Sequence, residues 1–392
     1  MSVLLRLSRL PRSYGYVLRN GPQNRVQKIS TSVRKPSTTR TIIKASLLGI
    51  SIGVPVGLGI VTGSTWYLEK QAAKSDALLG KQLEVVTLQE MPQVAISRKI
   101  ISPVDTTGLK LTLFQYQTCP FCCKVRVFLD YCGLSYDVVE VDPVLRREIS
   151  WSPYRKVPIL LAKTENGYLP LNDSTMIVSL LFSHLQDKSQ KIESLIDQYP
   201  NIATIDNEQK LKHEIMNKYF LMFNKPLPQD RSIDDITEER KWRKWADDVL
   251  VHTLSPNVYR SLDEAYETFN WFSAVGKWDE YFPTWERLLI VNVGALAMWM
   301  IAKRLKKRHN LKPDVRQSLY DEVNYWMSNV RARGGTFMGG EKPNLSDLAV
   351  YGVLKSIEGC TAFKDVLSNT KLRVWYNAMS KEIDTHSGSN LL

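Results

Sequence analysis

Two cysteines in a Cys-x-x-Cys spacing are the residues of this sequence best suited to chemistry. Cys119 and Cys122 follow a short apolar run, Leu111–Tyr116, and Pro120 stands between them. An apolar run followed by helical apolar spacing predicts a buried strand that passes into a helix at Cys119. Proline is favoured in the first helical turn, where its missing N–H loses no partner. The free N–H groups and the positive end of the helix dipole would lower the pKa of Cys119 and make it a nucleophile.

Three further groups of residues accompany the cysteines. Tyr116 ends the strand, where its phenol either donates a hydrogen bond to a reacting oxygen or only packs. Val157 and Pro158 begin a later apolar run, and proline belongs at the first residues of a strand because it cannot donate to the ladder. Asp173 and Ser174 precede another helical pattern and are expected to cap that helix. A helix start also offers N–H groups to a carboxylate.

The elements that must hold these residues alternate between strand and helix from 109 to 190. This order, with a hairpin before the last helix, predicts a thioredoxin-like α/β domain. The expected strands are a short one at 93–96, before the domain, and then 111–116, 136–141, 157–162 and 168–171; the expected helices are 120–132, 144–150 and 174–186.

The second half of the chain is predicted to be an all-α domain at 208–392, joined to the first by a linker at 191–207. The expected helices are 208–223, 236–270, 285–309, 314–333, 346–361 and 371–383. Leu288–Ala302 has no charged residue but is too short to span a bilayer, so we expect it to be the buried central helix. Asn344 and Asp347 have the spacing of a capping box.

The N-terminal segment differs from the rest in charge and hydropathy. Residues 1–68 carry +10 of the total charge of +12. The Arg- and Ser-rich leader, 1–44, is typical of a mitochondrial transit peptide, or is a basic tail that orients the next segment. Residues 45–68 are uncharged and long enough to be a single transmembrane anchor, the alternative being a Gly-rich linker. We expect 69–108 to be a spacer.

Composition argues against several classes of function. Beyond residue 68 the net charge is only +2, so the body of the chain lacks the basic footprint of a nucleic-acid-binding protein. Five cysteines, three of them clustered, do not make a disulfide framework and suit a reducing compartment. The five histidines do not have the spacing of metal ligands, so no metal site is expected.

Four stretches carry a resemblance to a known family. They are Leu111-Thr-Leu-Phe-Gln-Tyr116-Gln-Thr-Cys119-Pro-Phe121-Cys122, Val138-Val-Glu-Val-Asp-Pro-Val, Ser152-Pro-Tyr-Arg-Lys-Val157-Pro158-Ile-Leu and Leu171-Asn-Asp173-Ser174. From about 109 to 385 the chain resembles the glutathione-transferase family and, within it, the membrane-associated prostaglandin E synthases of type 2. The resemblance implies isomerisation of the prostaglandin H2 endoperoxide to prostaglandin E2, a homodimer, and a Golgi membrane as an alternative location to mitochondria.

The resemblance also implies a site that holds glutathione and haem. Tyr116 and Cys119 match the family's site tyrosine and first cysteine, and Phe121 and Cys122 match as well. The backbone of Val157 would then pair with the tripeptide. Pro158 would be cis, Asp173 and Ser174 would hold the γ-glutamyl end, and the haem iron would be ligated through the thiolate of bound glutathione.

Two other functions remain open from the sequence. Cys-Pro-Phe-Cys at a strand-to-helix junction is adequate for thiol–disulfide exchange, as in a glutaredoxin-like oxidoreductase. A membrane-tethered chain of this architecture could also be a scaffold without enzymatic activity. Saturable binding of a small molecule would argue against the scaffold.

Overall fold

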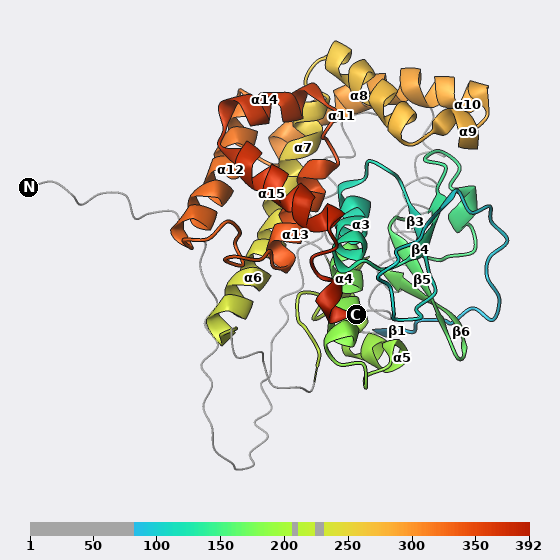
Figure 1. The fold of residues 1–392 in the computed structure, drawn as a ribbon. Coiled ribbons are helices and arrows are strands. Elements are labelled where there is room, and N and C mark those ends of the chain that lie inside the picture. The colour runs from blue at the N-terminus through green and yellow to red at the C-terminus, as the bar shows by residue number, and fades with distance from the viewer. Residues whose placement is uncertain (1–81, 206–210, 224–230) are drawn as a thin grey trace, which may run out of the picture. The chain divides into compact units, whose positions relative to one another are not determined.

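The computed structural model describes residues 82–205, 211–223 and 231–392, all within one compact unit of the chain. The predicted leader and transmembrane anchor lie outside the described residues. Two parts are visible in Figure 1, a sheet with its helices and a larger group of helices that follows it. This confirms the predicted architecture of a thioredoxin-like domain followed by an all-α domain.

The first domain is built on a five-stranded sheet with the order β2-β4-β3-β5-β6. β3 is parallel to β4, and the other neighbouring pairs are antiparallel. Helices α3 and α4 lie between this sheet and the C-terminal helices (Figure 1). The strands are β2 (Arg98–Ile100), β3 (Leu111–Gln115), β4 (Tyr136–Glu140), β5 (Ile159–Thr164) and β6 (Gly167–Asn172), and the helices are α3 (Pro120–Cys132) and α4 (Ser174–Gln186).

Two short elements of this domain were predicted wrongly. The first strand is β2, and 93–96 is not a strand. The predicted helix at 144–150 is only a 3₁₀ turn, Arg147–Ile149. Asp142 accepts hydrogen bonds from the N–H groups of Val144 and Leu145 at 2.8 and 3.2 Å, and Arg146 then has a φ of 54°. A left-handed residue cannot continue a helix, so this segment forms a loop.

The predicted linker and the predicted helix at 208–223 are also wrong, because they contain a hairpin. Helix α5 (Ile192–Leu195) and a 3₁₀ turn (Ile196–Gln198) are followed by β7 (Asn201–Ile205) and β8 (Leu211–Ile215). β7 pairs antiparallel with β8 and with β1 (Gln82–Leu83) in a second sheet. Pairing of this kind is decided by tertiary contacts and leaves a weak periodic signal in a polar sequence.

The C-terminal domain is helical, as predicted, but two predicted helices are divided. The segment predicted at 236–270 breaks after Val258, and Ser261 begins the next helix by accepting a hydrogen bond from Glu264 N–H at 3.1 Å. The segment predicted at 346–361 stops at Lys355, and a further helix begins at Thr361. The helices are α6 (Ile233–Trp245), α7 (Val251–Val258), α8 (Leu262–Val275), α9 (Trp278–Tyr281), α10 (Thr284–Leu289), α11 (Ala295–Arg308), α12 (Val315–Ala332), α13 (Leu345–Lys355), α14 (Thr361–Asn369) and α15 (Leu372–Asp384).

Two π-helical turns extend the longer helices of this domain. Ala246–Leu250 joins α6 to α7, and Ile290–Gly294 joins α10 to α11. The second of these makes Thr284–Arg308 one continuous helix. Its segment Leu288–Ala302 was expected to be the buried centre of the bundle, and this expectation is wrong, because six of the large apolar side chains of that segment are exposed. The centre of the domain is α13 instead, which is buried from Leu345 to Leu354.

The two domains share one hydrophobic core, in which α13 packs against α3. Their closest approach is at Gly352, where a Cβ atom would lie 2.7 Å from Lys124 Cα and 2.9 Å from its nitrogen. Backbone atoms cannot move aside as the end of a side chain can, so only glycine fits at this position.

We expect Gly352→Ala to lower the free energy of unfolding by about 2 kcal/mol, because overpacking here must push α13 away from α3. Urea denaturation followed by circular dichroism measures the change. Val374→Ala, at an exposed position of α15, is the control and should change the free energy by less than about 0.5 kcal/mol. Equal stability of the Gly352→Ala variant and the native chain would contradict the close contact.

Candidate functional site

Cys119 lies at the N-terminus of α3, as predicted from its position after the apolar strand. It is the N-cap residue, with extended backbone angles, and Pro120 occupies the first helical turn. Its side chain is partly exposed, whereas Cys122 is fully buried. The site thus offers one accessible thiol with a second thiol behind it.

The surroundings of the two thiols move their pKa values in opposite directions. The pKa of Cys119 is lowered, above all by a hydrogen bond from the Cys122 thiol; burial opposes this, and the N–H groups of Cys122 and Phe121 and the Arg126 guanidinium lower it further. Burial, and the bond that it donates to Cys119, raise the pKa of Cys122 well above its usual value. Of the two thiols, Cys119 is therefore the one more readily ionised, and Cys122 stays neutral as a donor.

Tyr116 belongs to the same packed cluster as the two thiols. Burial raises its pKa to about 12, while the nearby Arg146 guanidinium acts in the opposite direction. The phenol is thus protonated at neutral pH and can donate a hydrogen bond next to Cys119. Packing and donation, the two roles left open by the sequence, are compatible at this position.

Val157 also contacts this cluster, and its peptide bond to Pro158 is cis, as expected. Among the described residues, none forms a hydrogen bond with the backbone N–H or C=O of Val157. A pair of unpaired backbone groups beside a thiol is suited to an extended peptide, which can supply the missing partners.

Asp173 and Ser174 begin α4, as predicted. Asp173 has a φ of 70° and caps the helix, with one carboxylate oxygen accepting from Thr175 N–H at 2.9 Å and Met176 N–H at 3.3 Å. Its other oxygen pairs with Lys218 at 2.9 Å. The Ser174 hydroxyl has no hydrogen-bond partner in the part of the chain that the structure describes. Ser174 is therefore free to bind a ligand, while Asp173 is already engaged.

Phe121 positions its N–H toward Cys119, and its ring packs against the core with the Lys124 ammonium 5.6 Å from its centroid. Lys124 is buried and forms an ion pair with Asp247, which also accepts from Thr175 Oγ at 2.6 Å. Asp247 follows α6, so this buried network fixes the helical domain against the helices that carry the site.

Sequence reasoning missed three residues of the site. Tyr154 lies close enough to Asp173 and Cys119 for their negative charges to raise its pKa, although burial is the larger cause. Arg146 and Trp151 come from the loop that replaces the predicted helix at 144–150. Tyr154 could have been found from the sequence, since it stands only three residues before Val157. Arg146 and Trp151 could not, because a helix was wrongly predicted at 144–150.

Cys123 does not join the reactive pair. Its thiol donates to the Gln117 carbonyl at 3.5 Å and accepts from the Arg126 guanidinium at 3.1 Å. The histidines are also apart from the site; His252 and His309, for example, stack on each other with ring centroids 4.1 Å apart. In residues 82–205, 211–223 and 231–392, no group of three or more His, Cys, Asp or Glu side chains could hold a metal ion.

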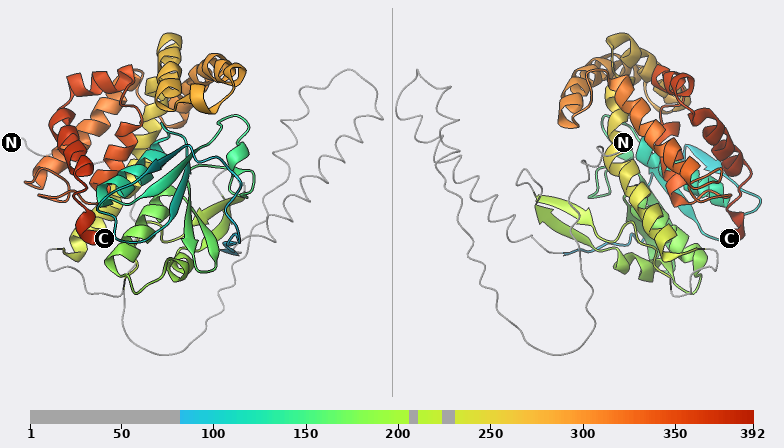
Figure 2. Two further views of the ribbon diagram at one scale, coloured as in Figure 1. Left: turned by 45° about the vertical axis from the view of Figure 1, so that its right-hand side comes forward. Right: turned by 90° about the vertical axis from the view of Figure 1, so that its left-hand side faces the viewer.

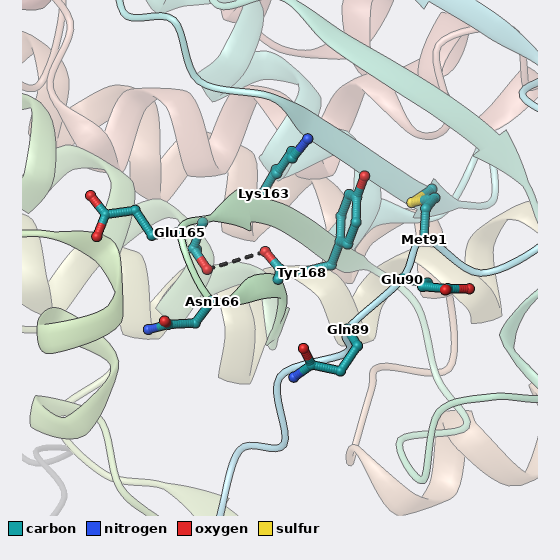
Figure 3. Close-up of a pocket in the computed structure, with 9 residues that line it drawn as sticks. Gln89, Glu90, Met91, Lys163, Glu165, Asn166 and Tyr168 are labelled. Carbon is teal, nitrogen blue, oxygen red and sulfur yellow. Dashed lines mark hydrogen bonds between the residues drawn. The ribbon is translucent and has the colours of Figure 1, made fainter.

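Two of the larger cavities lie away from Cys119. One of about 680 Å³ is lined by residues 89–91 and 163–168, and its side chains spread over the outside of the β5–β6 hairpin rather than converging on one point (Figure 3). Another of about 570 Å³ includes Phe128, Arg231 and Arg333. Neither is lined by Tyr116, Cys119 or Val157, so the thiol cluster remains the candidate site.

Comparison with known proteins agrees with the fold. Residues 113–189, which include every candidate site residue, match the glutathione S-transferase N-terminal domain. Prostaglandin E synthase 2 of Danio rerio is 47% identical over 70% of this chain and 71% of its own length. Prostaglandin E synthase 2 of Mus musculus is 42% identical over 84% of each chain. Glutathione S-transferase III in its apo form, a solved structure, is 13% identical over 71% of this chain and 96% of its own, with a TM-score of 0.40. The chain therefore belongs to the prostaglandin E synthase 2 family of proteins with a glutathione-transferase-like fold.

Proposed function

We propose that this protein isomerises prostaglandin H2 to prostaglandin E2 at the Cys119 site with glutathione bound beside it. The observation that carries the proposal is the accessible thiol with a lowered pKa, supported by a neutral thiol donor and next to a protonated phenol. An isomerase of this kind must break one O–O bond and move one proton without net oxidation or reduction. A thiolate and a phenol are sufficient for these two tasks.

The chain's own residues can complete the reaction in two steps. The Cys119 thiolate attacks one peroxide oxygen, the O–O bond breaks, and the leaving oxygen takes the proton of Tyr116 to become the product hydroxyl. The tyrosinate then removes the hydrogen from the carbon that bears the sulfur-bound oxygen. A C=O bond forms, the S–O bond breaks, and the electron pair returns to Cys119, so both residues end as they began.

The residues around Cys119 fit a glutathione molecule. The N–H and C=O of Val157 would pair with its backbone, and the hydroxyl of Ser174 would donate to its γ-glutamyl carboxylate. Asp173 lies next to that position and forms an ion pair with Lys218. The γ-glutamyl end of glutathione would therefore lie beside one negative and one positive side chain. Bound glutathione would supply a second thiol beside Cys119.

Haem fits these residues less well. In the part of the chain that the structure describes, no histidine is among the groups that shift the pKa values of Cys119, Cys122 and Tyr116. Haem would depend on the thiolate of bound glutathione as its iron ligand, and no step proposed here depends on it.

The partners and location are proposals as well. We infer a lipid endoperoxide as substrate, a homodimer, no nucleic acid, and attachment to a membrane through 45–68. Whether that membrane is mitochondrial, as the leader suggests, or Golgi, as the family resemblance suggests, is decided by locating the tagged full-length chain in cells.

A glutaredoxin-like activity is the second candidate, favoured by the hydrogen bond between the Cys119 and Cys122 thiols and their divergent pKa values. Reduction of a small disulfide by the native chain and by the Cys119→Ser and Cys122→Ser variants tests it. Activity that persists in Cys119→Ser, or is missing from the native chain, contradicts this candidate.

Calorimetric titration with glutathione tests the proposed site directly. We expect saturable binding to the native chain and an affinity about tenfold lower for Ser174→Ala, because a hydrogen bond to a carboxylate is lost. Ser380→Ala, on α15, should bind as the native chain does. A flat titration would reject the site and favour a scaffold role. Glutathione binding without formation of prostaglandin E2 would reject only the reaction.

A further inference from the structure

The continuous helix Thr284–Arg308 leaves an apolar face uncovered. Its side chains Trp285, Leu288, Val293 and Met300 are 62%, 52%, 58% and 51% exposed. By length and composition this helix could cross a membrane. Figures 1 and 2 show it with α8 and α9, in the gold and orange part of the ribbon, at the top of the molecule in every view. A surface helix normally turns such residues inward.

The opposite face of the helix is fixed to the protein. Ala295 and Ala302 are buried where α11 contacts α7 and α8, and a Cβ atom at Gly294 would lie 2.7 Å from the Phe269 ring. Glu286 is fully buried and pairs with Arg147 at 2.7 Å. A helix held in this way cannot be surrounded by lipid, so only its exposed face is available.

The C-terminal end of the same helix is strongly basic. The side chains of Arg304, Lys307 and Arg308 are exposed and make no hydrogen bond or ion pair with any residue that the structure describes. Lys303 lies 3.5 Å from the Trp299 ring centroid. Aromatic, aliphatic and cationic side chains in this order along one helix are typical of segments that lie in a lipid interface.

We propose that the exposed face of Thr284–Arg308 docks on the surface of a bilayer that contains anionic phospholipid. The apolar side chains enter the headgroup boundary, and the three free cations meet the lipid phosphates and carboxylates. A second copy of the chain matches this face less well. The only acidic residue between 284 and 308 is Glu286, which is buried, so the same helix of a second copy would bring no exposed counter-charge.

Docking in this way places the thiol site near the lipid. Arg147, which pairs with Glu286 of the helix, belongs to the loop that also carries Arg146 beside Tyr116. The same loop exposes Val144 and Leu145, two further apolar side chains. This inference concerns a surface and does not depend on the proposed reaction.

Fluorescence of a label on the helix tests the docking in the full chain. A Cys119→Ser background leaves four cysteines, all buried, so a polarity-sensitive dye attached at Met300→Cys reports this face alone. The chain is reconstituted into vesicles of phosphatidylcholine, with or without about one-third phosphatidylserine. A dye at Val374→Cys, 78% exposed on α15, is the control. We expect a blue shift, and quenching by brominated lipid, at position 300 with phosphatidylserine, and neither at position 374.

Charge variants distinguish docking from simple proximity to the vesicle. Each cation lost should lower the affinity of the helix for the bilayer about fivefold. The triple variant Arg304→Gln, Lys307→Gln and Arg308→Gln should therefore lower this affinity about a hundredfold. The matched control removes three exposed cations, Lys371 at the N-cap of α15 and Arg373 and Lys381 within it, and should leave the signal unchanged. Equal signals at positions 300 and 374, or no dependence on phosphatidylserine, would overturn the proposal. A blue shift at position 300 without lipid that grows with protein concentration would overturn it too, by showing a second copy on this face.

Discussion

Replacing Cys119 by serine should lower the rate of prostaglandin E2 formation about a thousandfold, the largest effect of any single change at the site. A serine hydroxyl is not ionised near neutral pH and cannot attack a peroxide oxygen as a thiolate does. The fold should be unaffected, since Cys119 is partly exposed and its side chain makes no capping hydrogen bond to α3. The rate is measured by separating the products formed from prostaglandin H2, with the thermal melting temperature as a check on folding.

The pH dependence of this rate identifies the role of Cys122. The thiolate of Cys119 is lost as the pH falls through its pKa, so the rate declines on the acid side. Because the hydrogen bond from Cys122 is the main reason that this pKa is low, Cys122→Ala should raise it. The acid limb then moves to higher pH, and the rate approaches that of the native chain at alkaline pH. An unmoved acid limb would mean that another group limits the rate. Cys123→Ala, the matched control, should leave it in place.

Replacing Asp347 by alanine should lower the free energy of unfolding by about 4 kcal/mol, the largest stability effect that we expect outside the site. This buried carboxylate accepts four hydrogen bonds. The donors are the N–H groups of Met338, Gly339 and Asn344 at 2.9, 3.0 and 3.0 Å and Trp375 Nε1–H at 3.1 Å. The capping box with Asn344 is present as predicted, but the carboxylate also joins the loop before α13 to α15.

Thermal unfolding measures the effect, and 4 kcal/mol corresponds to a fall of about 10 °C in the melting temperature. Asp347→Asn should recover only part of the loss, because an amide group places N–H donors where the protein already has donors. Asp384→Ala, an exposed carboxylate on α15, is the control and should change the melting temperature by about 1 °C or less. A small effect of Asp347→Ala would show that water can replace the carboxylate.

The sequence alone determined the elements in which local chemistry and packing agree. Strand β3 is rich in apolar residues, Pro120 begins α3, Gly133 ends it in the left-handed conformation, and Asp173 caps α4. These signals operate within a few residues, so they can be recognised without knowing the fold. They also placed Cys119 at the start of a helix, from which its reactivity follows.

Tertiary structure decided whatever depends on contacts between distant segments. β8 is a strand because β7 is there to pair with it, and 144–150 is a loop because Asp142 captures its first N–H groups. The apolar run Leu288–Ala302 was correctly predicted as a helix, but its spacing could not tell whether protein would cover it. The structure leaves one face of this helix uncovered, since the core of the domain is completed by α13 and its aromatic neighbours. Periodicity reveals that a helix is apolar, whereas only packing reveals which apolar face the protein itself buries.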